Sequence, residues 1–263
     1  MIKINGVIIN PTNFPDNTKL IKYQVDKFHR SCHIEWFYEN DEEMFLLYCL
    51  TLHCQKAGAD CTLFLPYIPN ARMDRTKSEE EVFTLKYFAE FINSLYFTEV
   101  QVLDPHSYVS TALIDRVRVI DASRCITEAI IRSNPDVIFF PDEGAMKRYS
   151  DLITNDCGRV FGIKNRDWKT GEIKGLELYG EIDKLKGAKI LIIDDICSKG
   201  GTFYHSAKAL HEAGAAAIDL YVTHCENTIF KGELLKEDSL INRIYTTNSL
   251  RRESSDKIEV FEL

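Results

Sequence analysis

The chain contains 263 residues, of which 45% are hydrophobic and 27% are charged. These proportions are typical of a globular protein and exclude a disordered, collagen-like or disulfide-scaffold chain. The formal net charge of −8 argues against a broad surface for nucleic acid or anionic membranes, because such surfaces depend on clustered lysine and arginine. Residues 1–14 lack a signal-peptide pattern, and apolar runs such as residues 190–193 are far shorter than the ~18 residues of a membrane span. We therefore expect a cytoplasmic protein with no nucleic-acid or membrane partner.

Eight cysteines are scattered along the chain and include no CxxC pair. His53 next to Cys54 has no partners at zinc-finger spacing. Cysteines in such a chain are usually reduced and buried as small apolar residues. We expect the same here, with Cys197 acting as a spacer within its segment.

Predicted helices and strands alternate along the chain, a pattern typical of βαβ units. In chain order, the sequence predicts a helix at 42–57, a strand at 61–66, a helix at 83–95, a strand at 99–103, a helix at 124–133, strands at 137–140, 160–163 and 189–193, a helix at 203–213 and a strand at 218–223. The first helix is predicted from its apolar residues Phe45, Leu46, Tyr48, Cys49 and Leu52. The fold class is therefore α/β, with mostly parallel sheets flanked by helices.

A weak internal repeat divides the chain. Residues 62–72 and 137–148 each consist of an apolar strand, a proline and a loop that reaches an arginine. Residues 100–107 (VQVLDPHS) likewise correspond to residues 190–198 (ILIIDDICS). Two copies of one α/β unit, with the boundary between residues 121 and 122, explain both correspondences.

The most specific local signal is KILIIDDICSKGGT, residues 189–202. A β-branched strand ends in Asp194 and Asp195, and a loop with two glycines follows before a helix. Ligands of open α/β sheets bind at such strand ends, and a loop of this kind offers backbone N–H groups to a phosphate. The carboxylates suit sugar hydroxyls or a metal ion, so the segment fits a phosphorylated ribose. The alternative is an ordinary turn with solvated carboxylates.

This segment resembles the ribose-phosphate loop of type I phosphoribosyltransferases and of ribose-phosphate pyrophosphokinases (PRPP synthetases). Further segments resemble the pyrophosphokinases and occur in that family's order. They are FPDNT (14–18), LPYIPNARMDR (65–75), LDPHS (103–107), FPDEGAMKR (140–148), KNR (164–166), THC (223–225) and TTNS (246–249). The resemblance implies two tandem domains of the type I phosphoribosyltransferase fold. Residues 1–121 would carry the ATP-binding segments, and residues 122–263 the ribose-phosphate loop.

The resemblance also implies roles for individual residues. They are ATP binding by Phe14, Asp16, Arg72, Asp74 and Arg75; metal coordination by His106 and Asp142; catalysis by the cations Lys164 and Arg166; ribose hydroxyl binding by Asp194 and Asp195; and phosphate binding by Ser198, Lys199, Gly200, Gly201 and Thr202. Each role has a simpler alternative. Asp142, for example, could cap the following helix, and Lys164 and Arg166 could be solvated loop charges.

The implied reaction is transfer of the β,γ-diphosphate of ATP to the anomeric hydroxyl of a ribose 5-phosphate group, with Mg²⁺ required and AMP released. The acceptor is free ribose 5-phosphate or the terminal ribose of ADP-ribose, because Ser198 and Lys199 stand where the family usually has Asp and Thr. Asn17 and Thr18 likewise replace Gly-Glu. The family also implies a homo-oligomer. The alternatives are a type I phosphoribosyltransferase and a non-catalytic regulatory subunit of a PRPP synthetase.

Overall fold

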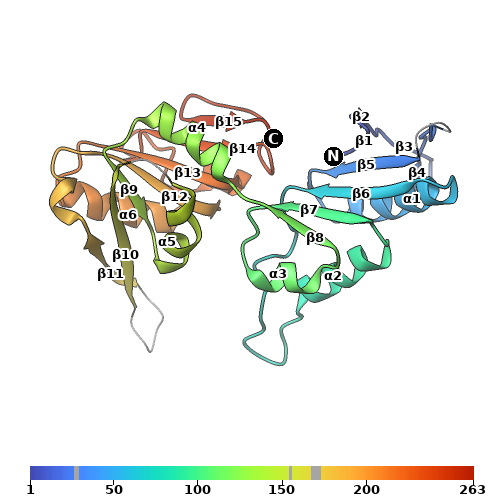
Figure 1. The fold of residues 1–263 in the computed structure, drawn as a ribbon, viewed down its shortest axis with the longest axis horizontal. Coiled ribbons are helices and arrows are strands. Elements are labelled where there is room, and N and C mark those ends of the chain that lie inside the picture. Colours follow the sequence, from blue (N-terminus) through green and yellow to red (C-terminus); the bar gives the residue numbers. More distant parts are fainter. Residues whose placement is uncertain (27–29, 154–155, 167–172) are drawn as a thin grey trace. The chain divides into compact units, whose positions relative to one another are not determined.

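The computed structural model describes residues 1–26, 30–153, 156–166 and 173–263, with only the backbone described for residues 164–166 and 173–175. It divides into two compact units, Met1–Asp121 and Ala122–Leu263 (Figure 1). Each unit is built around a mostly parallel β-sheet with helices packed on it, so the predicted α/β class is confirmed. Among the described residues, no helix has the length and apolar character needed to cross a bilayer.

The first unit contains a six-stranded sheet in the order β2-β1-β5-β6-β7-β8 and a separate β3-β4 hairpin. The strands are β1 (Ile2–Ile4), β2 (Val7–Ile8), β3 (Thr12–Asn13), β4 (Lys19–Leu20), β5 (Ser31–Trp36), β6 (Asp60–Leu65), β7 (Glu99–Leu103) and β8 (Val117–Ile120), and the helices are α1 (Glu42–Lys56), α2 (Thr84–Ser94) and α3 (Tyr108–Leu113). Strands β5 to β8 are parallel, and β1 is antiparallel to both its neighbours.

Helix α1 corrects one detail of the sequence analysis. Phe45, Tyr48 and Leu52 are 62%, 42% and 39% exposed, whereas Leu47 and Leu50 are buried against the sheet. The helix is apolar on both faces, so the sequence predicts that it forms but not which face packs inward.

The second unit contains a seven-stranded sheet in the order β11-β10-β9-β12-β13-β14-β15, in which only β11 is antiparallel to its neighbour. The strands are β9 (Val137–Phe140), β10 (Gly158–Arg166), β11 (Ile173–Gly180), β12 (Lys189–Cys197), β13 (Ala217–Cys225), β14 (Arg243–Thr247) and β15 (Ile258–Phe261), and the helices are α4 (Ser123–Ser133), α5 (Glu143–Tyr149) and α6 (Gly201–Glu212), with 3₁₀ turns at Ser150–Leu152, Ile182–Leu185 and Asn227–Lys231.

Alternating side chains of β12 fill two apolar layers. Ile190 and Ile192 pack in the cluster that contains Phe203 of α6. Leu191 and Ile193 pack on the opposite face with residues of α4 and α5. A strand buried on both faces reads as a continuous apolar run, which explains why the sequence predicts β12 so clearly.

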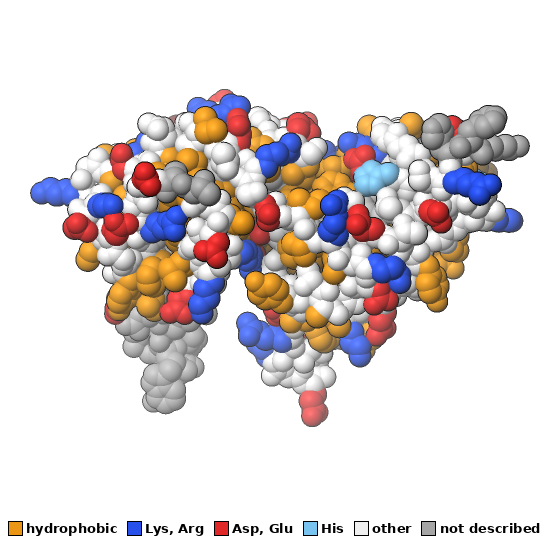
Figure 2. Space-filling model, viewed as in Figure 1, with side chains coloured by type: hydrophobic (Ala, Val, Ile, Leu, Met, Phe, Trp, Pro, Cys, Tyr) orange, Lys and Arg blue, Asp and Glu red, His pale blue; other side chains and the backbone are white. Residues whose placement is uncertain are grey.

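The cysteines behave as expected, since all eight are free. Cys32, Cys54, Cys61, Cys125, Cys197 and Cys225 are buried, and Cys49 and Cys157 are half-buried. On the face of the molecule shown in Figure 2, acidic and basic side chains are interspersed rather than gathered by sign.

Candidate functional site

The predicted site residues of the second unit lie where parallel strands end. Asp142 follows β9, and Asp194 and Asp195 lie near the end of β12. Glu226, which was not predicted, follows β13. Strand β12 pairs with both β9 and β13 in parallel, so the three carboxyl ends meet at one edge of the sheet. This is the edge at which open α/β sheets bind ligands.

Strand β12 extends four residues beyond its predicted end at residue 193. Asp194 and Asp195 therefore lie within a strand and not in the loop after it, and adjacent strand residues point to opposite faces. Asp195 continues the face covered by α5 and forms an ion pair with Arg148, whose Nη1 lies 2.7 Å from Oδ2 of Asp195. Two carboxylates that look equivalent in the sequence thus have different surroundings.

Asp194 is half-buried and lies among other acids. Burial raises its pKa well above the usual value, and the neighbouring charges of Asp195 and Asp142 raise it further. The backbone N–H of Asp195 donates to Oδ1 of Asp194 at 2.9 Å, which opposes that rise. The site therefore concentrates negative charge at the strand ends.

Asp142 is the N-cap of α5. Its Oδ1 accepts a hydrogen bond from the backbone N–H of Ala145 at 3.0 Å. This is the capping role considered from the sequence. No group of three or more His, Cys, Asp or Glu side chains in the described part of the chain is arranged to hold a metal ion.

Residues 198–202 form a loop, here called the phosphate loop, that leads from β12 into α6. Gly200 has φ +81° and precedes the first residue of α6, and any Cβ there would collide with the side chain of Leu234. The positive φ and the close contact together require glycine. Ser198 donates its hydroxyl proton to Oε2 of Glu226 at 2.8 Å. Lys199 is exposed.

In the first unit, two predicted segments lie at the carboxyl edge of the sheet. Arg72, Asp74 and Arg75 follow β6, and His106 lies between β7 and α3. Because β6 and β7 are adjacent and parallel, both loops leave the same edge. Asp74 and Arg75 form an ion pair of 3.6 Å in which the arginine is largely exposed.

The FPDNT segment is the exposed tip of the β3-β4 hairpin. Thr18 donates to Oδ1 of Asp16 from its hydroxyl at 2.7 Å and from its backbone N–H at 3.0 Å. These two bonds lower the pKa of Asp16. Phe14 is 47% exposed, as an aromatic side chain offered to a ligand would be.

Lys164 and Arg166 were expected just after a strand that ends at residue 163. The backbone of β10 instead continues to Arg166 and pairs with β11. Their side chains lie outside the described part of the structure, so their catalytic roles stay predictions.

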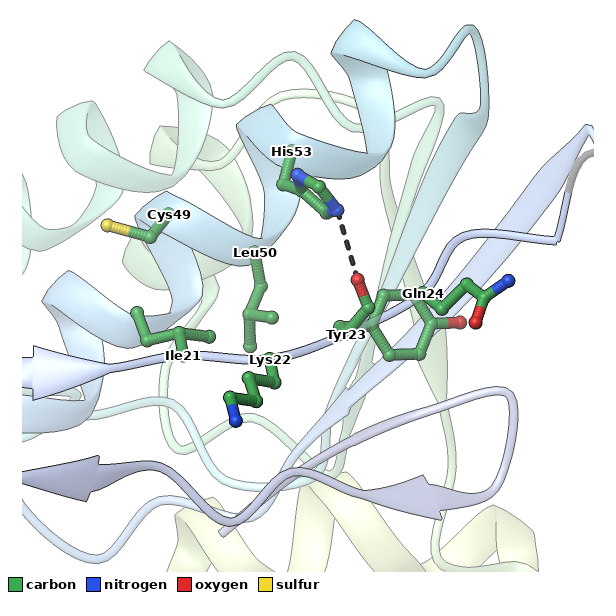
Figure 3. Close-up of a pocket in the computed structure, with 7 residues that line it drawn as sticks. All are labelled: Ile21, Lys22, Tyr23, Gln24, Cys49, Leu50 and His53. Carbon is green, nitrogen blue, oxygen red and sulfur yellow. Dashed lines mark hydrogen bonds between the residues drawn. The ribbon is translucent and has the colours of Figure 1, made fainter.

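The first unit also has a pocket of about 580 Å³ beside α1 (Figure 3). The segment from Ile21 to Gln24 crosses α1 there, and Nε2 of His53 lies 3.1 Å from the carbonyl oxygen of Tyr23. None of the predicted site residues lines this pocket.

Comparison with curated proteins finds several ribose-phosphate pyrophosphokinases that are similar to this chain. The chain is similar to the ribose-phosphate pyrophosphokinase of Sulfolobus acidocaldarius, with 29% identity over 213 residues that cover 78% of this chain and 70% of the relative. It is 26% identical to ribose-phosphate pyrophosphokinase 1 of Listeria innocua, covering 91% and 76%. The Pyrococcus abyssi enzyme is also 26% identical, covering 99% and 91%.

The chain is thus similar, over most of its length, to the ribose-phosphate pyrophosphokinase family. This is a family of diphosphotransferases. The fold of this chain agrees with that of phosphoribosylpyrophosphate synthetase from Mycobacterium smegmatis. The TM-score is 0.75 at 17% identity, and the match covers 97% of this chain and 86% of that one. No protein-family model matches the chain.

Two residues that sequence reasoning missed belong to this candidate site. Arg148 contacts Asp195, and Glu226 contacts Ser198. Nothing in the spacing of the sequence connects Arg148 with Asp195, 47 positions away. Glu226 could have been found, because it lies three residues beyond the end of a predicted strand and directly follows the observed strand β13.

Proposed function

We propose that this protein is a ribose-phosphate pyrophosphokinase that uses ATP as diphosphate donor. The anomeric hydroxyl oxygen of a ribose 5-phosphate group attacks the β-phosphorus of ATP, the bond to the bridging oxygen of the α-phosphate breaks, and AMP leaves. The hydroxyl proton passes to solvent. The observation that carries the proposal is the meeting of Asp142, Asp194, Asp195 and the phosphate loop at one edge of the second sheet.

In this proposal the phosphate loop holds the 5-phosphate through the backbone N–H groups at the start of α6. Asp194 and Asp195 accept hydrogen bonds from ribose hydroxyls, and Arg148 orients the carboxylate of Asp195. Arg72, Asp74 and Arg75 bind ATP, together with Phe14 and Asp16. These placements follow the family resemblance, and the strand-end positions support them.

The carboxylates of the second unit suit Mg²⁺ in ligand type, although the described side chains of the unit do not form a ready group of three ligands. Carboxylate oxygens are the ligands this ion prefers, and crowding of Asp194 with Asp142 and Asp195 favours a nearby cation. The ion would neutralise charge on the ATP phosphate oxygens. Asp142 would hold it in this unit, and His106 is the predicted ligand in the first. Lys164 and Arg166 would add fixed positive charge at the transferring group.

The acceptor is ribose 5-phosphate or the terminal ribose of ADP-ribose. The test incubates the protein with ATP, Mg²⁺ and each acceptor, then follows AMP and the mass of the product. We expect AMP with a diphosphorylated ribose product, and no turnover in excess chelator. ADP without AMP would contradict the reaction. Release of pyrophosphate from PRPP without ATP would instead identify a phosphoribosyltransferase, and no turnover of any substrate would favour a regulatory subunit.

We also propose a homo-oligomer, because the FPDNT hairpin lies apart in sequence from the other ATP segments and a neighbouring copy could complete the adenine pocket. Light scattering at the assay concentration tests this. An active monomer would contradict it.

A further inference from the structure

Glu226 contacts the phosphate loop with both its backbone and its side chain. Its backbone N–H donates to the carbonyl oxygen of Cys197 at 2.9 Å. Its Oε2 accepts hydrogen bonds from the hydroxyl of Ser198 at 2.8 Å and from that of Thr228 at 2.9 Å. The carboxylate therefore lies directly behind the first residue of the loop.

The segment that follows Glu226 supports the rest of the loop. A Cβ at Gly232 would collide with the carbonyl oxygen of Lys199, so the two backbones touch. The side chain of Leu234 fills the space where Gly200 lacks a Cβ. Residues 226–234 thus pack against the phosphate loop and support it. Within this segment, Glu226 is the charged residue whose side chain forms a hydrogen bond with the loop.

The Ser198–Glu226 hydrogen bond changes what the loop can offer an anion. A serine hydroxyl has one proton, and Ser198 donates it to Glu226, so the hydroxyl cannot donate to a bound phosphate at the same time. The backbone N–H groups at the start of α6 remain as donors. The carboxylate behind the loop opposes each further negative charge on the ligand.

We infer that Glu226 is a positioning and specificity residue of the ribose-phosphate site. It fixes Ser198 and makes the loop prefer a phosphate that carries one negative charge, as in a phosphodiester or a diphosphate diester, over a phosphomonoester. A phosphomonoester carries close to two negative charges at neutral pH. This inference rests on the proposed function, because it takes the loop as the site of the 5-phosphate.

The test compares two ligands that differ by one charge: ribose 5-phosphate and its methyl phosphodiester. Calorimetric titration of the full chain without ATP gives both affinities. Glu226→Gln keeps an oxygen that can accept from Ser198 and Thr228 but removes the charge. We expect this change to tighten ribose 5-phosphate binding about three- to tenfold, the effect of one unit charge across several ångströms of partly solvated space, and to change diester binding less than twofold.

Glu212→Gln is the matched control. Glu212 is exposed at the far end of α6, roughly 16 Å along the helix from the loop, and loses the same charge. Neither affinity should change. Thr228→Ala keeps the carboxylate and removes one hydrogen bond, so it should alter both affinities equally. Melting curves confirm that each variant is folded.

The outcomes separate this inference from the proposed function. If Glu226→Gln moves both affinities equally or neither, the charge role of Glu226 is wrong, whereas AMP formation by the parent protein would still support the enzyme. If the parent binds neither ribose ligand at millimolar concentration, the loop is not a ribose-phosphate site and both proposals fail.

Discussion

Replacing Arg148 by methionine tests how the site holds Asp195. The carboxylate is 4% exposed, and its ion pair with Arg148 measures 2.7 Å, with 30% of the arginine side chain exposed. Breaking a fully buried pair costs about 3–5 kcal/mol, and exposed pairs contribute about 1 kcal/mol or less. A pair with one buried and one half-buried member lies between these limits. We expect Arg148→Met to lower the free energy of unfolding by about 2–3 kcal/mol.

A double-mutant cycle with Arg148→Met, Asp195→Asn and the double variant isolates the pair itself. Unfolding in guanidinium chloride, followed by circular dichroism, gives each free energy. Arg132→Met is the control, because the side chain of Arg132 is 49% exposed in its ion pairs with Glu128 and Glu259, and its loss should lower the free energy of unfolding less than that of Arg148. A coupling energy between Arg148 and Asp195 below about 0.5 kcal/mol would refute the reasoning.

Four further substitutions test the site. Lys164→Ala and Arg166→Ala should each lower turnover about a hundred- to a thousandfold with unchanged melting temperature, and turnover within threefold of the parent would remove their catalytic assignment. Asp194 has a raised folded-state pKa, so its ionisation destabilises the fold as pH rises above the ordinary aspartate value of 3.8. Asp194→Asn should therefore raise the free energy of unfolding at pH 8, by about 1.4 kcal/mol for each unit by which the pKa is raised. At pH 3.5 the substitution should leave that free energy unchanged. Equal stabilities of variant and parent at pH 8 would contradict this reasoning. Gly200→Ala should cost roughly 1–3 kcal/mol, since it places a Cβ at positive φ against Leu234, and a denaturation midpoint equal to that of the parent would count against this packing.

The sequence predicts most of the central elements because their physical signals are local. Residues 99–103 and 137–140 form strands with the predicted bounds. Their apolar side chains mark a buried strand without any knowledge of the residues that pack against them. The short strands β1 to β4 were missed because a strand of two or three residues is too short to show the alternation of apolar and polar side chains. Helix α5 was missed as an element because it spans seven residues, although its cap, Asp142, was considered as one.

The bounds of β12 and β10 show where local reasoning fails. Two consecutive carboxylates look like the end of a strand, yet β12 continues because Arg148 pairs with Asp195 on one face and Asp194 remains half-buried on the other. The ion pair depends on a residue 47 positions away, in a helix that the sequence does not predict. The partner of Ser198 is likewise supplied by the end of a neighbouring strand.

The acidic cluster at the strand ends lowers the stability of the folded state, and the fold itself does not require these acids. Burial and the charges of Asp195 and Asp142 disfavour ionised Asp194, so the folded protein would be more stable with a neutral side chain there. The charge of Asp195 is balanced by its ion pair with Arg148. The site thus keeps Asp194, whose ionised form is unfavourable, beside Asp195, whose charge is paired. Such an arrangement suits a ligand that supplies positive charge or hydrogen bonds to Asp194. A divalent cation and ribose hydroxyls would supply these, so the electrostatics of the second unit favour a ligand-binding site over an ordinary turn with solvated acids.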